Sequence, residues 1–144
     1  MNNRILIING PNLDLLGKRQ PEIYGSVSMD DILKSIGQKF PELKVSYKQS
    51  TKEYKIIQWI HKYAFHQKKD FVGIIINAGA FSHYSYALAD AIAMSRIPIV
   101  NVHISDLSQR EKWRQNDIIA PYCKHSISGK GVICYEMAIQ YLLK

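Results

Sequence analysis

Residues 71–95 read FVGIIINAGAFSHYSYALADAIAMS, which is an apolar run, then a polar loop, then an alanine-rich segment. The run Phe71–Ile76 is apolar at almost every position, which is typical of a strand buried on both faces within a parallel sheet. The segment Ser85–Ser95 predicts a helix, and a helix is the usual connection between two parallel strands. This stretch therefore indicates an α/β protein.

The same order of strand and helix recurs along the rest of the chain. The other expected strands are Arg4–Asn9, Leu43–Gln49, Ile97–Val102 and Ser126–Ser128, and the other expected helices are Ser28–Phe40, Glu53–Gln67 and Val132–Leu143. Five strands separated mostly by helices favour a flavodoxin-like, doubly wound parallel sheet in the order 2-1-3-4-5. We expect one domain over residues 1–144.

The composition is that of an ordinary globular domain, with 47% apolar and 22% charged residues in a chain of 144. No apolar stretch approaches the roughly 20 residues that span a membrane. The apolar N-terminal run is also shorter than the core of a signal peptide. We therefore expect a cytoplasmic protein without a membrane partner. Cys123 and Cys134 lack a CxxC spacing and are expected to be free thiols.

The formal net charge of +7 comes mostly from lysines that are scattered along the chain. Without a run of basic residues, this charge favours a solvated surface over a nucleic-acid partner. Arginine is more informative, because Arg19, Arg110 and Arg114 lie in polar loops rather than on periodic helices. Guanidinium groups make directional contacts with carboxylates and hydroxyls. The substrate is therefore expected to be a small anion.

Polar loops follow three strands that are neighbours in the predicted order, and they span Asn9–Gly25, Ile76–His83 and Asn101–Asp106. Ligands of such sheets bind beyond the carboxyl ends of the strands. The side chains expected to share one cleft are Asn12, Arg19, Tyr24, Asn77, His83 and His103. Each of them alone also fits a turn or a structural role, but three polar loops at one edge favour a site.

The sequence lacks the residues that several kinds of catalysis require. No set of Cys, Asp or Glu accompanies His83 and His103 to complete a metal site. The chain has neither a GxSxG nucleophile motif nor a phosphate-binding loop after its first strand, and no lysine lies in an apolar strand. The remaining possibility is acid–base catalysis by Tyr24 and a histidine, while arginines and asparagines hold an anion.

A phenol is a weak base at neutral pH, because its ordinary pKa is about 10. A neighbouring guanidinium lowers such a pKa by about 1–3. Arg19 lies on the same loop as Tyr24, and either Arg110 or Arg114 can supply a second cation from the fourth strand. The long loop after the first strand is therefore predicted to be a lid that carries the base and its activator.

Three segments closely resemble the type II 3-dehydroquinate dehydratases: INGPNLDLLGKRQPEIYG at 8–25, IIINAGAFSHYSYALADAI at 74–92 and VNVHISDLSQREKWR at 100–114. The weaker match SISGKGVICYEMAI at 126–139 extends the resemblance over nearly the whole chain. The resemblance implies a cofactor-free, reversible trans-dehydration of 3-dehydroquinate to 3-dehydroshikimate through an enolate. This is a step of the shikimate pathway toward chorismate and the aromatic amino acids. A biosynthetic role and a role in quinate breakdown both stay open.

The resemblance also implies a role for each residue of the cleft. Tyr24 removes a proton from carbon 2, next to the ketone, and Arg19 activates it. Arg110 is a second cation near the phenol, and Asn12 positions a water against the enolate oxygen. His103 protonates the hydroxyl that leaves carbon 1.

The same resemblance places the substrate in the cleft. Its carboxylate is expected to meet Asn77 and the backbone amides of Ile104 and Ser105. Its ring hydroxyls are expected to meet His83, Arg114 and, from a neighbouring subunit, Asp90. The implied assembly is a homododecamer, a tetramer of trimers.

One position departs from the family pattern in a way that bears on the chemistry. The family usually has a glutamate two residues before the acid histidine, where this chain has Asn101. An asparagine carbonyl can accept the ring N–H and fix the tautomer, but it adds no charge. We expect an enzyme that is about 10- to 100-fold slower or more acid-shifted, and we expect Asn101→Glu to raise turnover.

Three other interpretations compete with an enzymatic function. Asn101 is compatible with a protein that binds an anionic ring without turning it over. The fold alone is compatible with a flavin- or nucleotide-binding module, although the phosphate loop is missing. The net charge is compatible with nucleic-acid binding, which would require affinity that survives moderate salt.

Overall fold

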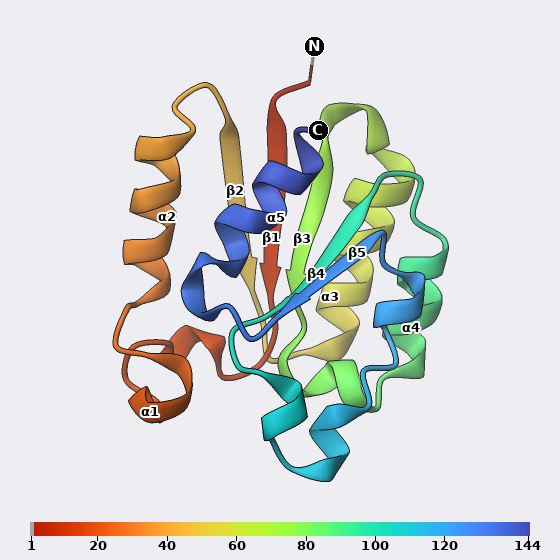
Figure 1. The fold of residues 1–144 in the computed structure, drawn as a ribbon. Helices are drawn as coiled ribbons and strands as arrows, with labels where there is room; N and C mark the ends of the chain where they lie inside the picture. The colour runs from red at the N-terminus through yellow and green to blue at the C-terminus, as the bar shows by residue number, and fades with distance from the viewer. Residues whose placement is uncertain (1) are drawn as a thin grey trace.

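A five-stranded parallel sheet forms the centre of the molecule in the computed structural model, which describes residues 2–144 (Figure 1). Its strands are β1 (Arg4–Asn9), β2 (Lys44–Gln49), β3 (Gly73–Asn77), β4 (Ile99–His103) and β5 (His125–Ser128). They pair in the order β2-β1-β3-β4-β5, and every pair is parallel. The predicted fold class and strand order are confirmed.

Helices cover both faces of this sheet. On one face lie α2 (Met29–Lys39) and α5 (Cys134–Leu142), and on the other lie α3 (Glu53–Ile60) and α4 (Tyr86–Ala93) (Figure 1). Strand β1 shows why both faces must be apolar. Its alternate residues Ile5 and Ile7 pack toward α2 and α5, whereas Leu6 and Ile8 pack toward α3 and α4. All four side chains are fully buried, so the continuous apolar run predicts a strand with a core on each side.

Two helices differ in extent from the expectation. The helix expected over Glu53–Gln67 is α-helical only to Ile60 and continues as a wider π-helical turn over His61–His66. The Ala64 carbonyl in this turn accepts a hydrogen bond from the Arg96 amide after α4, at 2.8 Å. The closing helix begins at Cys134 rather than Val132, because Gly131–Ile133 form a tighter 3-10 turn before it.

The tips of β1 and β3 lie in direct contact because of Gly10. The Gly10 amide donates a 2.7 Å hydrogen bond to the Asn77 carbonyl. A Cβ atom at this position would lie 2.4 Å from the Ala78 carbonyl oxygen, so only glycine permits the approach. The loops that follow the two strands are therefore held side by side.

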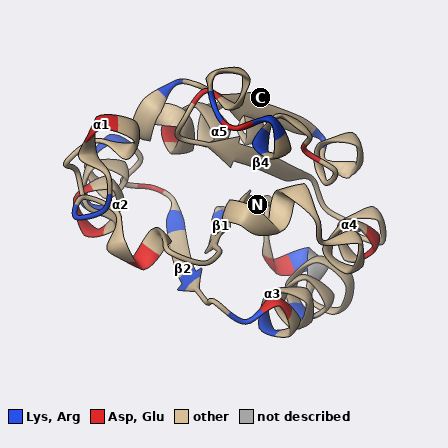
Figure 2. Ribbon diagram, turned by 90° about the horizontal axis from the view of Figure 1, so that it is seen from below, with Lys and Arg blue, Asp and Glu red and all other residues tan. Residues whose placement is uncertain are grey.

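Lysine and arginine are spread over many elements, with acidic residues between them, when the molecule is viewed from the edge at which the strands end (Figure 2). Within residues 2–144, no helix is both long and apolar enough to cross a lipid bilayer.

Candidate active site

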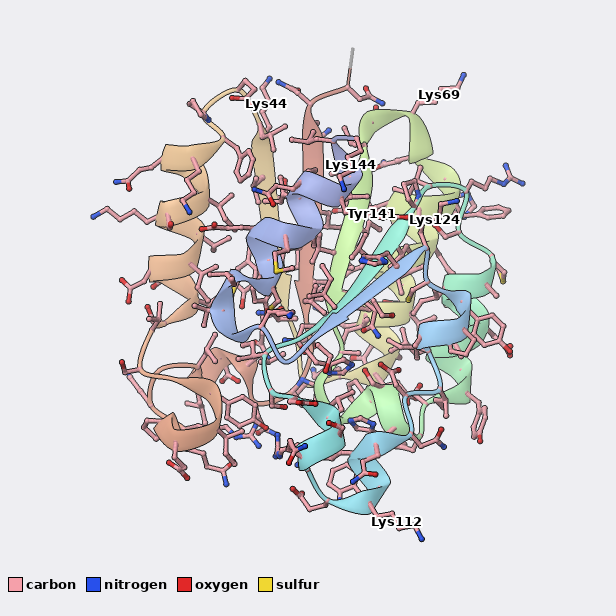
Figure 3. The ribbon with its side chains drawn as sticks, viewed as in Figure 1. Lys44, Lys69, Lys112, Lys124, Tyr141 and Lys144 are labelled. Atoms are coloured by element: carbon pink, nitrogen blue, oxygen red, sulfur yellow. The ribbon has the colours of Figure 1, made fainter. Side chains whose placement is uncertain are left out.

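A pocket opens at the carboxyl edge of the sheet, between the loops that follow β1, β3 and β4. Figure 3 shows this edge at the bottom, near Lys112, while Lys44 and Lys69 mark the opposite edge. The cavity volume of this pocket is about 50 Å³. The predicted residues that line it are Asn12, Arg19, Tyr24, Asn77, His83, His103, Ile104, Ser105, Arg110 and Arg114.

Tyr24 enters the pocket from a short helix that sequence reasoning missed, α1 (Pro21–Tyr24). Proline suits the first position of a helix, and Gly25, with a φ of 80°, ends the helix directly after the tyrosine. Gln20, which precedes it, also has a positive φ, of 36°. This is an uncommon conformation for a residue with a side chain, and such strain is concentrated at functional sites.

Two guanidinium groups approach the Tyr24 phenol. Arg110 Nη1 donates to the phenol oxygen at 3.1 Å and also to Ser105 Oγ at 3.0 Å. The Arg19 guanidinium lies over the phenol ring, 4.6 Å from its centroid. Only 8% of the tyrosine is exposed. Two positively charged groups therefore lie against the phenol in a partly desolvated place.

His103, the last residue of β4, faces a carboxylate that was not predicted. His103 Nε2 lies 2.8 Å from Asp117 Oδ2, and Asn101 Nδ2 donates to the same oxygen at 2.7 Å. Burial acts to raise the pKa of Asp117, but its hydrogen bonds with His103 and Asn101 outweigh this and hold the pKa below its ordinary value.

The expectation that Asn101 accepts the ring N–H of His103 is wrong. The Asn101 amide nitrogen points to Asp117, and its oxygen Oδ1 is buried without a hydrogen-bond partner among residues 2–144. Asp117 occupies the place beside the ring instead. Nothing in the spacing of Asp117 separates it from an ordinary loop carboxylate, so sequence reasoning did not find it.

His83 lies against His103 from the loop after β3. The two rings stack with centroids 5.9 Å apart, and the edge of Trp113 contacts His83 at 5.4 Å. His83 Nδ1 donates to the Asn116 carbonyl at 3.0 Å, because a carbonyl can only accept. Burial lowers the pKa of His83, and the nearby His103 lowers it further, against the raising effect of the Asn116 bond. The ring is therefore neutral at pH 7, with Nε2 as an acceptor.

Arg114 completes this side of the pocket. Its guanidinium lies over the Trp113 ring at 4.1 Å, and its Nε donates to Glu111 at 2.8 Å. The hydrogen bond from Arg114 lowers the pKa of Glu111 to about 2. Because the same carboxylate also accepts from Arg110 Nε at 3.3 Å, Glu111 orients both arginines.

Asn77 is held by a buried polar network at the tips of β1 and β3. Its Nδ2 donates to the Tyr135 hydroxyl at 3.2 Å, and that hydroxyl donates to Asn9 Oδ1 at 2.7 Å. Asn77 Oδ1 accepts from the Gly79 amide at 3.3 Å, which leaves one N–H of the side-chain amide free of these bonds. Asn9 and Tyr135 are further residues that the sequence analysis did not single out.

Asp90 is one predicted site residue that the chain does not bring to its own pocket, since it is exposed on α4. Asn101 is the other, because it lies fully buried behind His103 and Asp117. In the described part of the chain, no three His, Cys, Asp or Glu side chains are arranged to hold a metal ion. The thiols Cys123 and Cys134 are free, and burial raises the pKa of each to about 12.

The fold and the pocket define a doubly wound α/β protein with a tyrosine, histidine and arginine site at the carboxyl edge of its sheet. The chain belongs to the dehydroquinase class II family, whose sequence profile matches residues 3–143.

Named relatives agree with this assignment over the full length. The 3-dehydroquinate dehydratase of Caldicellulosiruptor bescii is 50% identical over 143 residues, which are 98% of this chain and 96% of the relative. That of Thermotoga petrophila is 42% identical over 144 residues, with 98% and 95% covered. The type II dehydroquinase structure from Butyrivibrio crossotus superposes with a TM-score of 0.92 at 38% identity, covering 99% of each chain. That from Propionibacterium acnes gives 0.89 at 35%, covering 99% of this chain and 97% of the other.

Proposed function

We propose that this chain is a cytoplasmic 3-dehydroquinate dehydratase of type II, which converts 3-dehydroquinate to 3-dehydroshikimate in the shikimate pathway. Membership of the class II dehydroquinase family supports the reaction. The observation that carries the mechanism is the Tyr24 phenol, which lies beneath Arg19 and within hydrogen-bond distance of Arg110.

The first step is removal of a proton from carbon 2 of the substrate by the Tyr24 phenolate. The electron pair of the broken C–H bond moves toward the neighbouring ketone and gives an enolate. Arg19 and Arg110 favour the phenolate that starts the step, because both place positive charge beside the phenol. Asn12 lines the same pocket. We assign to Asn12 the role of positioning a water molecule that hydrogen-bonds the enolate oxygen.

The second step is loss of the hydroxyl from carbon 1. The enolate collapses back to the ketone, a double bond forms between carbons 1 and 2, and the C–O bond breaks. His103, as an imidazolium, gives its proton to the departing oxygen, so water leaves. Tyr24 enters the pocket from α1 in the loop after β1, and His103 enters it from the end of β4.

The remaining pocket residues hold the substrate. We assign its carboxylate to the free N–H of the Asn77 amide and to the backbone amides of Ile104 and Ser105, just beyond β4. His83 Nε2 and Arg114 are assigned to the ring hydroxyls. Asp90 would add a contact from a neighbouring subunit, within a homododecamer that is a tetramer of trimers.

The test is an ultraviolet assay for the conjugated enone product, with 3-dehydroquinate, a chelator and no added cofactor. Tyr24→Phe removes only the hydroxyl and is expected to lower turnover by about 10³-fold or more, with substrate still bound. Tyr122→Phe, at an exposed tyrosine outside the pocket, is the matched control and should keep full activity.

Each contrary result has a defined meaning. No turnover by the correctly folded wild-type protein, with binding of the ligand retained, would favour a binding protein that has lost catalysis. Equal turnover by Tyr24→Phe would remove the tyrosine from the mechanism. A yellow purified protein would point instead to a flavin module.

A further inference from the structure

We propose that Asp117 is a positioning residue for the acid step, supplying from the loop after β4 the carboxylate that orients His103 and stabilises its imidazolium form. This role rests on the proposed dehydration, in which His103 protonates the leaving hydroxyl. It places the supporting charge of the acid histidine at position 117, fourteen residues along the chain, rather than on strand β4 itself.

The Asp117 carboxylate is held from both sides. Its oxygen Oδ1 accepts hydrogen bonds from the backbone amides of Ile119 and Ala120, each at 3.2 Å. Its oxygen Oδ2 accepts from His103 Nε2 at 2.8 Å and from Asn101 Nδ2 at 2.7 Å. The side chains of Asp117 and His103 are only 12% and 7% exposed. The pair is therefore fixed and partly desolvated, the setting in which charge-assisted hydrogen bonds are strongest.

Asn101 has the side chain that fits this arrangement. An amide can turn its nitrogen toward a carboxylate, and Asn101 does so even though its own oxygen is left buried and unpartnered among residues 2–144. A glutamate at position 101 would instead bring a second negative charge to the same buried place. Like charges this close cannot both remain ionised without a large cost. Asn101 and Asp117 thus form a matched amide and carboxylate behind the acid histidine.

The contact determines which ring nitrogen does the chemistry. An ionised carboxylate only accepts, so His103 Nε2 carries a proton in both charge states of the ring. Nδ1 is then the nitrogen that gains and loses the catalytic proton. A fixed negative charge beside Nε2 stabilises the imidazolium, as a buried aspartate does for the histidine of a catalytic triad.

Other titratable groups also act on this pair. His83 stacks on the His103 ring, Arg114 adds positive charge near His83, and the half-buried thiol of Cys123 lies within the field of Asp117. Any pH profile of the site therefore combines these groups, and comparison between variants is needed to isolate Asp117.

The first experiment compares Asp117→Asn with the wild type. The asparagine keeps the shape and an oxygen for the Ile119 and Ala120 amides, but it loses the charge. We expect kcat to fall about 10- to 100-fold, part of the effect of a general acid, with KM changed less than about twofold. Asp106→Asn is the matched control, because Asp106 also accepts a backbone hydrogen bond, from Ser108, but is exposed and outside the pocket.

The second experiment separates positioning from a merely structural role. In a His103→Gln background there is no imidazolium to support, so adding Asp117→Asn should change kcat by less than about twofold, since residues that act as a unit are not additive. A further fall as large as that seen with His103 present would overturn the proposal, because it would show that Asp117 acts without the histidine. Equal kcat for Asp117→Asn and the wild type would overturn it too.

A third measurement is made on the wild type and therefore does not depend on whether an aspartate variant folds. With ¹⁵N-labelled histidine, the wild-type His103 ring, assigned by its loss in His103→Gln, should be the Nε2–H tautomer when neutral, with a strongly downfield Nε2 proton. An Nδ1–H tautomer would overturn the proposal even if Asp117→Asn proved unstable. Absence of dehydration by the wild type, with this tautomer present, would instead count against the proposed function.

Discussion

At the scale of single residues, the Arg110 side chain makes several hydrogen bonds at once. One nitrogen, Nη1, reaches both the Tyr24 phenol and Ser105 Oγ, while Nε reaches Glu111. This geometry uses the planar fork of a guanidinium, which an ammonium group cannot reproduce. The charge of Arg110 alone is therefore not enough to hold the phenol in place.

We predict that Arg110→Lys keeps the fold and substrate binding but lowers kcat about 100- to 1,000-fold, comparable to losing one donor at a site of developing charge. Steady-state kinetics with 3-dehydroquinate would measure it. Arg96→Lys, at an arginine that lies over Phe65 outside the pocket, should be neutral. Full activity of Arg110→Lys would show that charge without geometry suffices.

The structure changes the expectation for Asn101. Because Asp117 already places a carboxylate beside His103, a glutamate at 101 would add a second one to a buried site. We predict that Asn101→Glu alone does not raise turnover and lowers the melting temperature. Asn101→Glu combined with Asp117→Asn should be faster than Asp117→Asn alone, since one carboxylate is restored. Faster turnover by Asn101→Glu alone would contradict this.

The hydrogen bonds of Asp117 also predict how the free energy of unfolding depends on pH. Burial acts to raise the pKa of Asp117, but the hydrogen bonds from His103 and Asn101 leave it below the ordinary 3.8. The stabilisation is therefore present in full above about pH 4 and is lost as pH falls through the lower pKa of the folded state. The difference in unfolding free energy between wild type and Asp117→Asn should narrow as the pH falls below about 4 in denaturant titrations. A difference constant over this range would contradict the pairing.

At the scale of elements, the strands were predictable because burial on both faces demands an unbroken apolar run, as in β1 and β3. Helix α1 was not, because four residues that begin with proline carry no periodic pattern. The π-helical turn at His61–His66 was missed for a similar reason, since its apolar spacing continues that of α3.

The site was predictable where residues follow neighbouring strands, because parallel strands end at the same edge. This places Asn77 and His103 in one pocket without knowledge of side-chain contacts. Asp117 and Tyr135 were not predictable in this way. Asp117 reaches β4 from a loop of irregular turns, and the Tyr135 hydroxyl crosses the sheet tips from α5 to Asn9 and Asn77.

Contact between the tips of β1 and β3 leads to a prediction about Gly10. In Gly10→Ala the new methyl group meets backbone atoms of Ala78, at 2.4 Å and 2.7 Å, so the tips must separate. We expect a loss of about 3 kcal/mol or more of stability, together with reduced activity, in thermal unfolding and enone assays.

Gly37→Ala is the matched control for that substitution. Gly37 lies within α2 and a Cβ there meets nothing within 4 Å, so the change should stabilise by about 0.5–1 kcal/mol. Equal effects of the two substitutions would show that the strand tips do not require close approach.

At the scale of the whole molecule, the proposed dodecamer makes a testable demand on Asp90. This residue is exposed on α4 and outside the pocket of its own chain. If it serves a neighbouring pocket, Tyr24→Phe and Asp90→Ala subunits should complement each other when mixed, because some interfaces then combine an intact tyrosine with an intact aspartate.

The measurement is enone formation after the two variants are dissociated and reassembled together, with the oligomeric mass determined by light scattering. Mixed assemblies should be more active than either variant alone. Reassembly of each variant with itself is the control. Mixed dodecamers no more active than the average of their parents would place Asp90 outside the neighbour's site.

The hydrogen bond between Arg110 and Tyr24 joins positions 86 residues apart, on loops that follow different strands. The surroundings of the Tyr24 phenol are therefore assembled from two parts of the molecule rather than from one of them. Any displacement of the Tyr24 loop from β4 would separate the phenol from Arg110, while Arg19, which lies on the same loop, would stay beside it. In the proposed mechanism, the phenol thus has both cations beside it only when the two loops lie together, as they do in this structure.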